Sequence, residues 1–176
     1  MKIRMGVWVV LMVGSCSWAM AQAASNPVAD TVRQMEESRS KNLIAAAEAM
    51  PPDKYSYKPT PEQMSFGHLV LHIAETNNTL CSKLGPEKQE VKFDGTESKD
   101  TLVRALRDSF DFCHKALEHA NDSNLAEPMT LFGGHSGTRA TALITLATSW
   151  ADHYSAEAMY LRLNNLLPPT AAAKAK

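Results

Sequence analysis

The sequence predicts an all-α fold, a four-helix bundle. The chain has 176 residues, of which 44% are hydrophobic and 21% are charged, and this composition is typical of one globular domain with its own core. Apolar side chains recur at helical spacing in four segments that proline or glycine separates, and no convincing strand lies between them. These segments are residues 27–49, 65–84, 98–120 and 140–166. Amphipathic helices of this length bury a core by packing together.

The first 21 residues predict a cleaved signal peptide. Lys2 and Arg4 form a short positive start, and an apolar stretch follows over residues 6–19. Residues 19–21 (Ala-Met-Ala) fit the pattern of small residues that precedes a cleavage site. An uncleaved membrane anchor is one alternative, and a lipoprotein attached through Cys16 is another. Cleavage would place the mature chain in the periplasm or outside the cell.

The first helix is expected from Pro27 to Ala49. Apolar residues recur along one of its faces and charged residues cover another, and the Pro51-Pro52 pair ends it. The following segment, residues 51–64, holds four prolines and two tyrosines. We expect an ordered loop across the end of the bundle, with a flexible linker as the alternative.

The second helix is expected to start at Ser65, a residue type that caps helix N-termini. Gly85-Pro86 ends it, and the polar residues 88–98 form a connection. The third helix is expected over residues 98–120, with its leucines, Phe110 and Cys113 on the inner face.

A long loop with one proline and three glycines is expected over residues 121–139. The fourth helix follows over residues 140–166 and ends before Pro168-Pro169. We therefore place the bundle domain at residues 22–170 and a disordered tail at residues 171–176.

Two cysteines of the mature chain, Cys81 and Cys113, constrain the topology. Each lies about 15 residues beyond the start of its helix. In parallel helices they would stand at one height, whereas in antiparallel neighbours they would lie about 15–18 Å apart along the axis. A disulfide needs Cα atoms within about 7 Å, so it goes with a parallel pair. The alternative is two reduced, buried cysteines.

The histidines are the candidates for chemistry. His68 and His72 lie four residues apart in the second helix and share a face, and His153 and Glu157 do the same in the fourth. Histidines that converge from two facing helices are how bundles build metal sites. The alternative is that these are core or surface histidines with hydrogen-bond partners. We expect His114, His119 and His135 at the surface, and none of them is a candidate metal ligand.

Other function classes find little support. The formal net charge is −1, whereas nucleic-acid binders normally carry a basic excess. Residues 133–137 (Gly-Gly-His-Ser-Gly) lack the lysine of a phosphate-binding loop, and they do not match the Gly-x-Ser-x-Gly pattern of a nucleophile elbow. The mature cysteines are too far apart in sequence for a Cys-x-x-Cys redox pair.

Several stretches together resemble the DinB/YfiT-like superfamily, and the resemblance extends over essentially the whole mature chain. Those of the first half are Pro59-Thr60-Pro61-Glu62, Ser65-Phe66-Gly67-His68-Leu69-Val70-Leu71-His72-Ile73-Ala74 and Leu80-Cys81-Ser82. Those of the second half are Leu131-Phe132-Gly133, Asp152-His153-Tyr154, Tyr160-Leu161-Arg162-Leu163-Asn164 and Pro168-Pro169. The motifs of the second and fourth helices are specific only in combination.

The resemblance implies a bundle of up-down-down-up order, in which the second and third helices are parallel. It also implies a divalent metal, which is zinc, nickel or iron, held by three histidines. One of them is at the position of His72, and the others form a His-x-x-x-His pair on the last helix. Characterised relatives include metal-dependent transferases that act on small thiols, and they often dimerise, so a homodimer is an expectation here too.

The sequence departs from this pattern at Ser149, which stands where the first histidine of the pair is expected. The expected metal ligands are therefore His72 and His153, with His68 or Glu157 as the substitute for the third.

Two functions are compatible with these residues. One is an exported, metal-dependent enzyme, similar to a thiol transferase or a hydrolase, acting on a small molecule. The other is a non-catalytic bundle that binds a small molecule or a protein partner. The sequence does not decide whether the protein is an enzyme.

Overall fold

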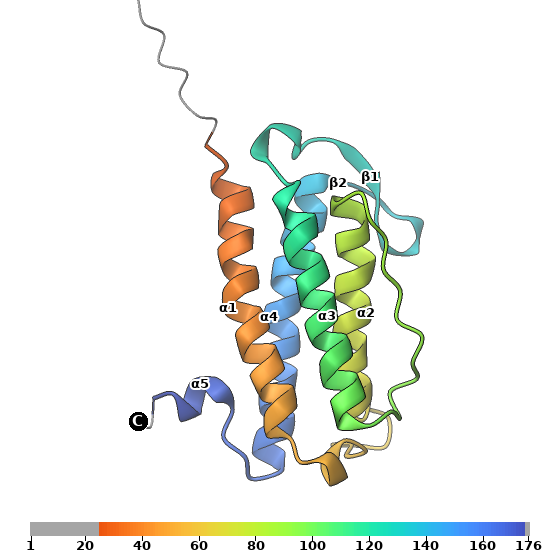
Figure 1. Ribbon diagram of the computed structural model, residues 1–176, viewed down its shortest axis with the longest axis vertical. Coiled ribbons are helices and arrows are strands. Elements are labelled where there is room, and N and C mark those ends of the chain that lie inside the picture. Colours follow the sequence, from red (N-terminus) through yellow and green to blue (C-terminus); the bar gives the residue numbers. More distant parts are fainter. Residues whose placement is uncertain (1–24, 175–176) are drawn as a thin grey trace, which may run out of the picture.

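The computed structural model describes residues 25–174 and shows four long helices packed side by side (Figure 1). The expected signal peptide of residues 1–21 lies outside the described residues. The helices are α1 (Pro27–Ala49), α2 (Phe66–Leu84), α3 (Lys99–Glu118), α4 (Arg139–Leu163) and the short α5 (Pro169–Ala172). Short 3-10 turns cover Pro52–Lys54, Asp122–Asn124 and Phe132–Gly134, and two strands are β1 (Pro128–Thr130) and β2 (Ser136–Thr138). Within this part of the chain, no helix is both long and apolar enough to cross a membrane.

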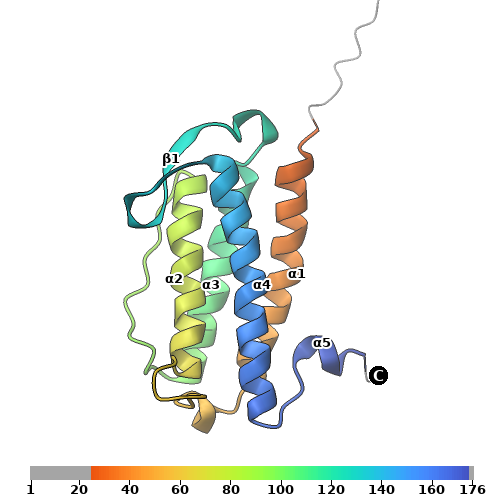
Figure 2. The same cartoon turned by 180° about the vertical axis from the view of Figure 1, so that it is seen from behind.

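The helix order is up-down-down-up, as the family resemblance implies. In Figure 1, α1 and α4 run in one direction and α2 and α3 in the other. The connection between α2 and α3, residues 85–98, returns along the side of the bundle from one end to the other (Figures 1 and 2). Each long helix packs against two others. Helix α2 contacts α3 and α4, and α1 contacts the same two helices. The pair α2 and α4 is therefore adjacent and antiparallel.

The helix ends follow local capping rules. The Ser65 hydroxyl accepts a hydrogen bond from the backbone N–H of His68, and Ser98 and Thr138 cap α3 and α4 in the same way. Proline at the first position of α1 loses nothing, because the N–H that it lacks would have no partner there. These caps fix where α2 and α4 begin, and so fix the height of the residues that face each other between them.

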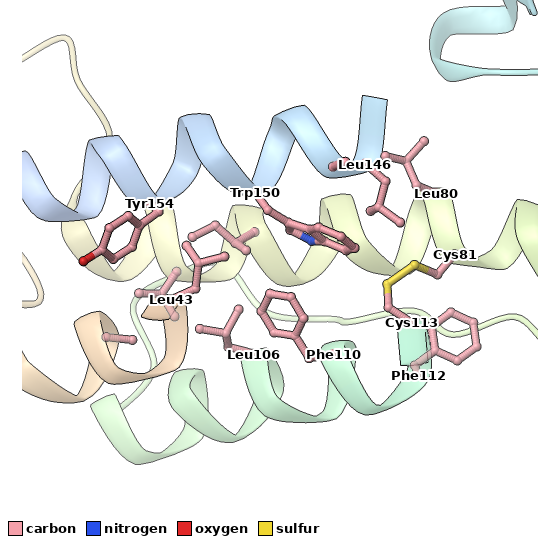
Figure 3. Packing of buried hydrophobic residues seen from close by; sticks show 14 of the residues in the cluster. Leu43, Leu80, Cys81, Leu106, Phe110, Phe112, Cys113, Leu146, Trp150 and Tyr154 are labelled. Atoms are coloured by element: carbon pink, nitrogen blue, oxygen red, sulfur yellow. A yellow bond between two sulfur atoms is a disulfide. The ribbon is translucent and has the colours of Figure 1, made fainter. Parts of the chain in front are cut away.

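The core is filled by apolar side chains from all four long helices (Figure 3). Trp150 is fully buried at its centre and packs near Phe110, with 6.0 Å between ring centroids. Its indole N–H donates to Asn77 Oδ1 at 2.8 Å, and the Asn77 amide donates to Ser109 Oγ at 3.1 Å. This chain of buried hydrogen bonds joins α4 to α2 and α3. Each of its polar groups has a partner, and without one it would be costly to bury.

A disulfide joins Cys81 of α2 to Cys113 of α3, with 5.1 Å between their Cα atoms (Figure 3). Both residues are fully buried. The bond agrees with the parallel arrangement of α2 and α3, which brings the two cysteines to one height. Of the two alternatives for the cysteines, the structure has the disulfide.

The loop before α2 is ordered against the bundle, as expected. The Tyr55 hydroxyl donates to the carbonyl of Ala47 at 2.7 Å, and its buried ring meets Phe66 edge to face. Tyr57 contacts the ring of Tyr160 on α4 in the same geometry. Two aromatic contacts hold this segment to α2 and α4, and the hydrogen bond of Tyr55 holds it to α1.

The expectation that the chain has no strand was wrong. Strands β1 and β2 form an antiparallel hairpin in which Met129 pairs with Gly137. Gly133 and Gly134 turn the chain between them with positive φ angles, which glycine adopts without strain. The strands have three residues each, and this is shorter than the runs of four to eight by which alternation reveals a strand. The hairpin lies at the end of the bundle where α2 finishes, since Arg139 donates to the carbonyl of Leu84.

The chain after α4 also differs from the expected tail. Residues 169–172 form α5, although a disordered segment was expected from residue 171. The hydroxyl of Tyr154 both donates to Thr170 Oγ1 and accepts from its backbone N–H. Tyr154 therefore fixes the first turn of α5. The helix α5 contacts α1.

Gly95, in the connection of residues 85–98, packs directly against α2. Its φ is +86°, and a Cβ at this position would lie 2.8 Å from Cα of His68. We expect Gly95→Ala to lower the free energy of unfolding by about 1–2 kcal/mol, because it adds backbone strain and a clash with helix backbone. Urea unfolding followed by circular dichroism measures this. Gly134→Ala is the matched control, because Gly134 also has positive φ but nothing lies within 4 Å of the added methyl. Equal losses in both variants would contradict a close-packing role for Gly95.

Candidate functional site

His72 of α2 and His153 of α4 face each other where the two helices pack. Their ring centroids lie 5.2 Å apart, and the rings meet edge to face at 86°. Both side chains are half-buried. The helix caps and the antiparallel pairing of α2 and α4 bring these two residues to one height. The sequence prediction that the two histidines converge from facing helices is therefore met in the structure.

The environment of His153 keeps its ring neutral. Burial, and after it the nearby His72, lower the pKa of His153 to about 4, although Asp152 opposes this shift. The Nδ1 atom is buried and has no hydrogen-bond partner among the described residues. A neutral imidazole has one nitrogen with a free lone pair, which is the form that binds a metal ion. His153 is thus ready to act as a ligand at neutral pH.

Glu157 lies one helical turn beyond His153 on α4 and faces the core. Its side chain is 0% exposed, and neither carboxylate oxygen has a hydrogen-bond partner in the part of the chain that is described. Burial raises the pKa of Glu157 well above its ordinary value of 4.5. The pKa of Tyr55 is raised too, chiefly by burial and secondly by the charge of Glu157. An unpaired buried carboxyl is costly, so it calls for an explanation.

The other candidate ligand, His68, lies one turn before His72 and is exposed at the start of α2. Among residues 25–174, no group of three or more His, Cys, Asp or Glu side chains is arranged to hold a metal ion. The structure therefore brings together His72 and His153 and does not add His68 or Glu157 to them as a third ligand. Ligation by either residue stays a prediction. Ser149 lies one turn before His153 and is half-buried.

The remaining histidines stand apart from this pair. His114, His119 and His135 are exposed, as expected. His114 Nδ1 lies 3.3 Å from the carboxylate of Glu36 on α1, a residue that was expected on the charged face of this helix but is buried. Burial raises the pKa of Glu36, and the hydrogen bond to His114 opposes the shift.

Asn78 is a second polar residue that sequence reasoning missed. It is 2% exposed, and both atoms of its amide lack a partner among the described residues. It lines a cleft of about 330 Å³ between α2 and the connection, together with Glu75 and Val91. The sequence carries no signal for it, because an asparagine in an amphipathic helix normally lies at the surface.

The bundle order and the facing histidines of α2 and α4 define a class of helical proteins with a site between two antiparallel helices. The chain belongs to the DinB superfamily, whose family model matches residues 34–155. A search of curated proteins gives no match.

Solved structures share the fold. A DinB-like protein from Bacillus cereus ATCC 10987 has a TM-score of 0.69 and 17% identity, over 80% of this chain and 95% of that one. A DinB-like protein from Bacillus subtilis has a TM-score of 0.63 and 20% identity, over 77% and 92%. A mycothiol-dependent maleylpyruvate isomerase has a TM-score of 0.60 and 13% identity, over 72% of this chain and 59% of the isomerase. At these identities the similarity establishes the fold alone.

Proposed function

We propose that this DinB superfamily protein is exported and binds one divalent transition metal between His72 and His153, as part of a metal-dependent enzyme. The observation that carries the proposal is the pair of half-buried imidazoles 5.2 Å apart on facing helices. The substrate class is a small molecule, and the reaction is a thiol transfer or a hydrolysis. The isomerase of the same fold, which is named as mycothiol-dependent, supports the thiol reading.

The donors of the site fit such a metal. Imidazole nitrogens suit zinc, nickel and iron(II), and the low pKa of His153 keeps its lone pair free at neutral pH. The Nδ1 atom of His153 is buried and has no partner among the described residues, so Nε2 is the nitrogen that would face an ion. Only two imidazoles are present, and Ser149 is a poor ligand, so we expect weaker binding than at a complete three-histidine site. His68 would supply the third ligand in this proposal, because Glu157 is fully buried.

The chain's own residues would hold and orient the reactants. When bound, the metal would act as a Lewis acid toward a thiol or a carbonyl group. His72 and His153 would fix it at the edge between α2 and α4, where both side chains are half-buried and so partly open to solvent. The apolar core behind them excludes water from one side of the site.

Export is proposed on the leader and the disulfide. The leader pattern of residues 1–21 directs a chain out of the cytoplasm, and the disulfide between Cys81 and Cys113 persists in an oxidising compartment. The periplasm or the medium is the proposed location. Homodimer formation stays a prediction from the family.

The second candidate function is a non-catalytic bundle that binds a small molecule or a protein partner. Ser149 favours it, because the position expected to supply a third histidine has lost its ligand. The two functions differ in one measurable property, the metal content of the protein.

We expect about one zinc or nickel ion per chain when tag-free mature protein is purified without chelator and the metal is added back. His72→Ala and His153→Ala should each lose it, because each removes one of only two imidazoles. Mass spectrometry of the metal measures the content, and His119→Ala is the control, since His119 is exposed and distant in sequence from both helices' histidines. Unchanged metal content in both variants would refute the ligand assignment. Metal-free wild-type protein with an intact helical fold would favour the non-catalytic function.

A further inference from the structure

We propose that Glu157 is a positioning residue for His153: its carboxyl group accepts a hydrogen bond from Nδ1–H of His153 and so keeps Nε2 as the ring's free acceptor. The hydrogen bond would orient His153 as a metal ligand, and this role rests on the proposed function. The bond itself does not, because it concerns two side chains of the chain alone.

The two residues have complementary unmet needs. The buried side-chain atoms without a hydrogen-bond partner, among the residues described, belong to Asn78, Asn124, His153 and Glu157. Of these four, only His153 and Glu157 lie on one helix and one turn apart. One offers a ring nitrogen that can carry a proton, and the other offers two carboxyl oxygens. Each is therefore a chemically suitable partner for the other, although neither lies within hydrogen-bond distance of the other in the structure.

The helix geometry brings them within reach. Residues four apart have Cβ atoms about 5–6 Å from each other, and helical side chains lean toward the N-terminus of their helix. The Glu157 side chain therefore leans toward the turn that holds His153. The structure holds no hydrogen bond between the two groups, so the proposed bond needs a change of rotamer or one buried water with partners on both sides.

The depths of the groups distinguish positioning from ligation. Glu157 is fully buried, whereas His72 and His153 are half-buried at the edge between α2 and α4. A carboxyl behind a ligating imidazole is the usual way in which proteins fix its orientation and tautomer. Asp152 does not replace it, because it is exposed and neighbours in sequence point to different faces of a helix.

The tautomer of His153 tests the proposal in metal-free protein. Long-range ¹⁵N–¹H correlation spectra above pH 7 report which ring nitrogen carries the proton. We expect Nδ1–H in the wild type and in Glu157→Gln, whose amide oxygen can still accept, and Nε2–H in Glu157→Met. Asp152→Asn, which removes the exposed neighbouring carboxylate, should leave the tautomer unchanged. An Nε2–H tautomer in the wild type, or one tautomer in all the variants, would overturn the proposal.

Zinc affinity then tests the purpose of the bond. We expect Glu157→Met to weaken zinc binding by about 10–100-fold, with Glu157→Gln closer to the wild type. Equal zinc affinity in the wild type and Glu157→Met would overturn the positioning role. If the wild type binds no zinc while His153 carries Nδ1–H, the proposed metal site fails and the hydrogen bond stands. The two proposals can therefore fail separately.

Discussion

Replacing both cysteines, Cys81→Ala with Cys113→Ala, is expected to lower the free energy of unfolding by about 3–4 kcal/mol. The disulfide spans 32 positions of sequence and includes the long connection between α2 and α3. Without it, the unfolded chain gains the freedom of that loop, and the value follows from the chain-entropy relation for a loop of this length. The folded state loses less, because both cysteines lie among apolar side chains that alanine leaves largely in place (Figure 3).

Urea unfolding of the oxidised protein measures this loss. Reductant should lower the stability of the wild type to nearly that of the double variant and should leave the double variant unchanged. Thiol titration of the denatured, unreduced mature protein should find about zero free thiols. A loss below about 1 kcal/mol would mean that the unfolded chain already holds the two helices together, or that the bond is absent in solution.

The helices were predictable because their signals are local. The apolar spacing, the Pro51-Pro52 stop and the Ser65 cap each act within a few residues, and α1 spans the expected residues 27–49. The parallel pair was predictable only through the cysteines and the family resemblance, since spacing alone allows either direction. Val28 and Leu163 follow the apolar spacing of their helices but are 38% and 52% exposed, because they lie at the outer ends of α1 and α4.

What the sequence did not reveal depends on contacts between distant segments. The β1–β2 hairpin exists through pairing across a loop, and α5 is fixed by a hydroxyl of Tyr154 sixteen residues earlier. In the candidate site, helical spacing placed His153 and Glu157 on one face. It did not reveal that a rotation of about 40° between them separates the edge of the helix pair from the core. This difference in depth turns Glu157 from an expected ligand into a proposed positioning residue.

Replacing Glu157 by methionine is expected to stabilise the metal-free protein by about 2–3 kcal/mol at pH 8. Methionine fills a similar volume without a carboxyl that burial disfavours, and this gain exceeds the loss of one hydrogen bond to His153. The folded-state pKa of Glu157 lies well above its unfolded value of about 4.5, so the folded state keeps a proton that the unfolded state releases. Stability therefore falls as the pH rises above 4.5, by at most about 1.4 kcal/mol per pH unit, until the folded pKa is passed.

The difference in stability between Glu157→Met and the wild type should thus be small below pH 4.5 and should grow as the pH rises. Urea unfolding at a series of pH values measures it, and Glu157→Gln is the control, because it removes the ionisation and keeps a buried polar group. His153 contributes the opposite slope, since its folded pKa of about 4 is below the ordinary 6.5 and its contribution is lost as the pH falls through that range. A less stable Glu157→Met at pH 8 would show that the carboxyl is well paired in solution. A more stable variant that binds zinc poorly would show that the chain retains Glu157 for its site at the expense of its fold.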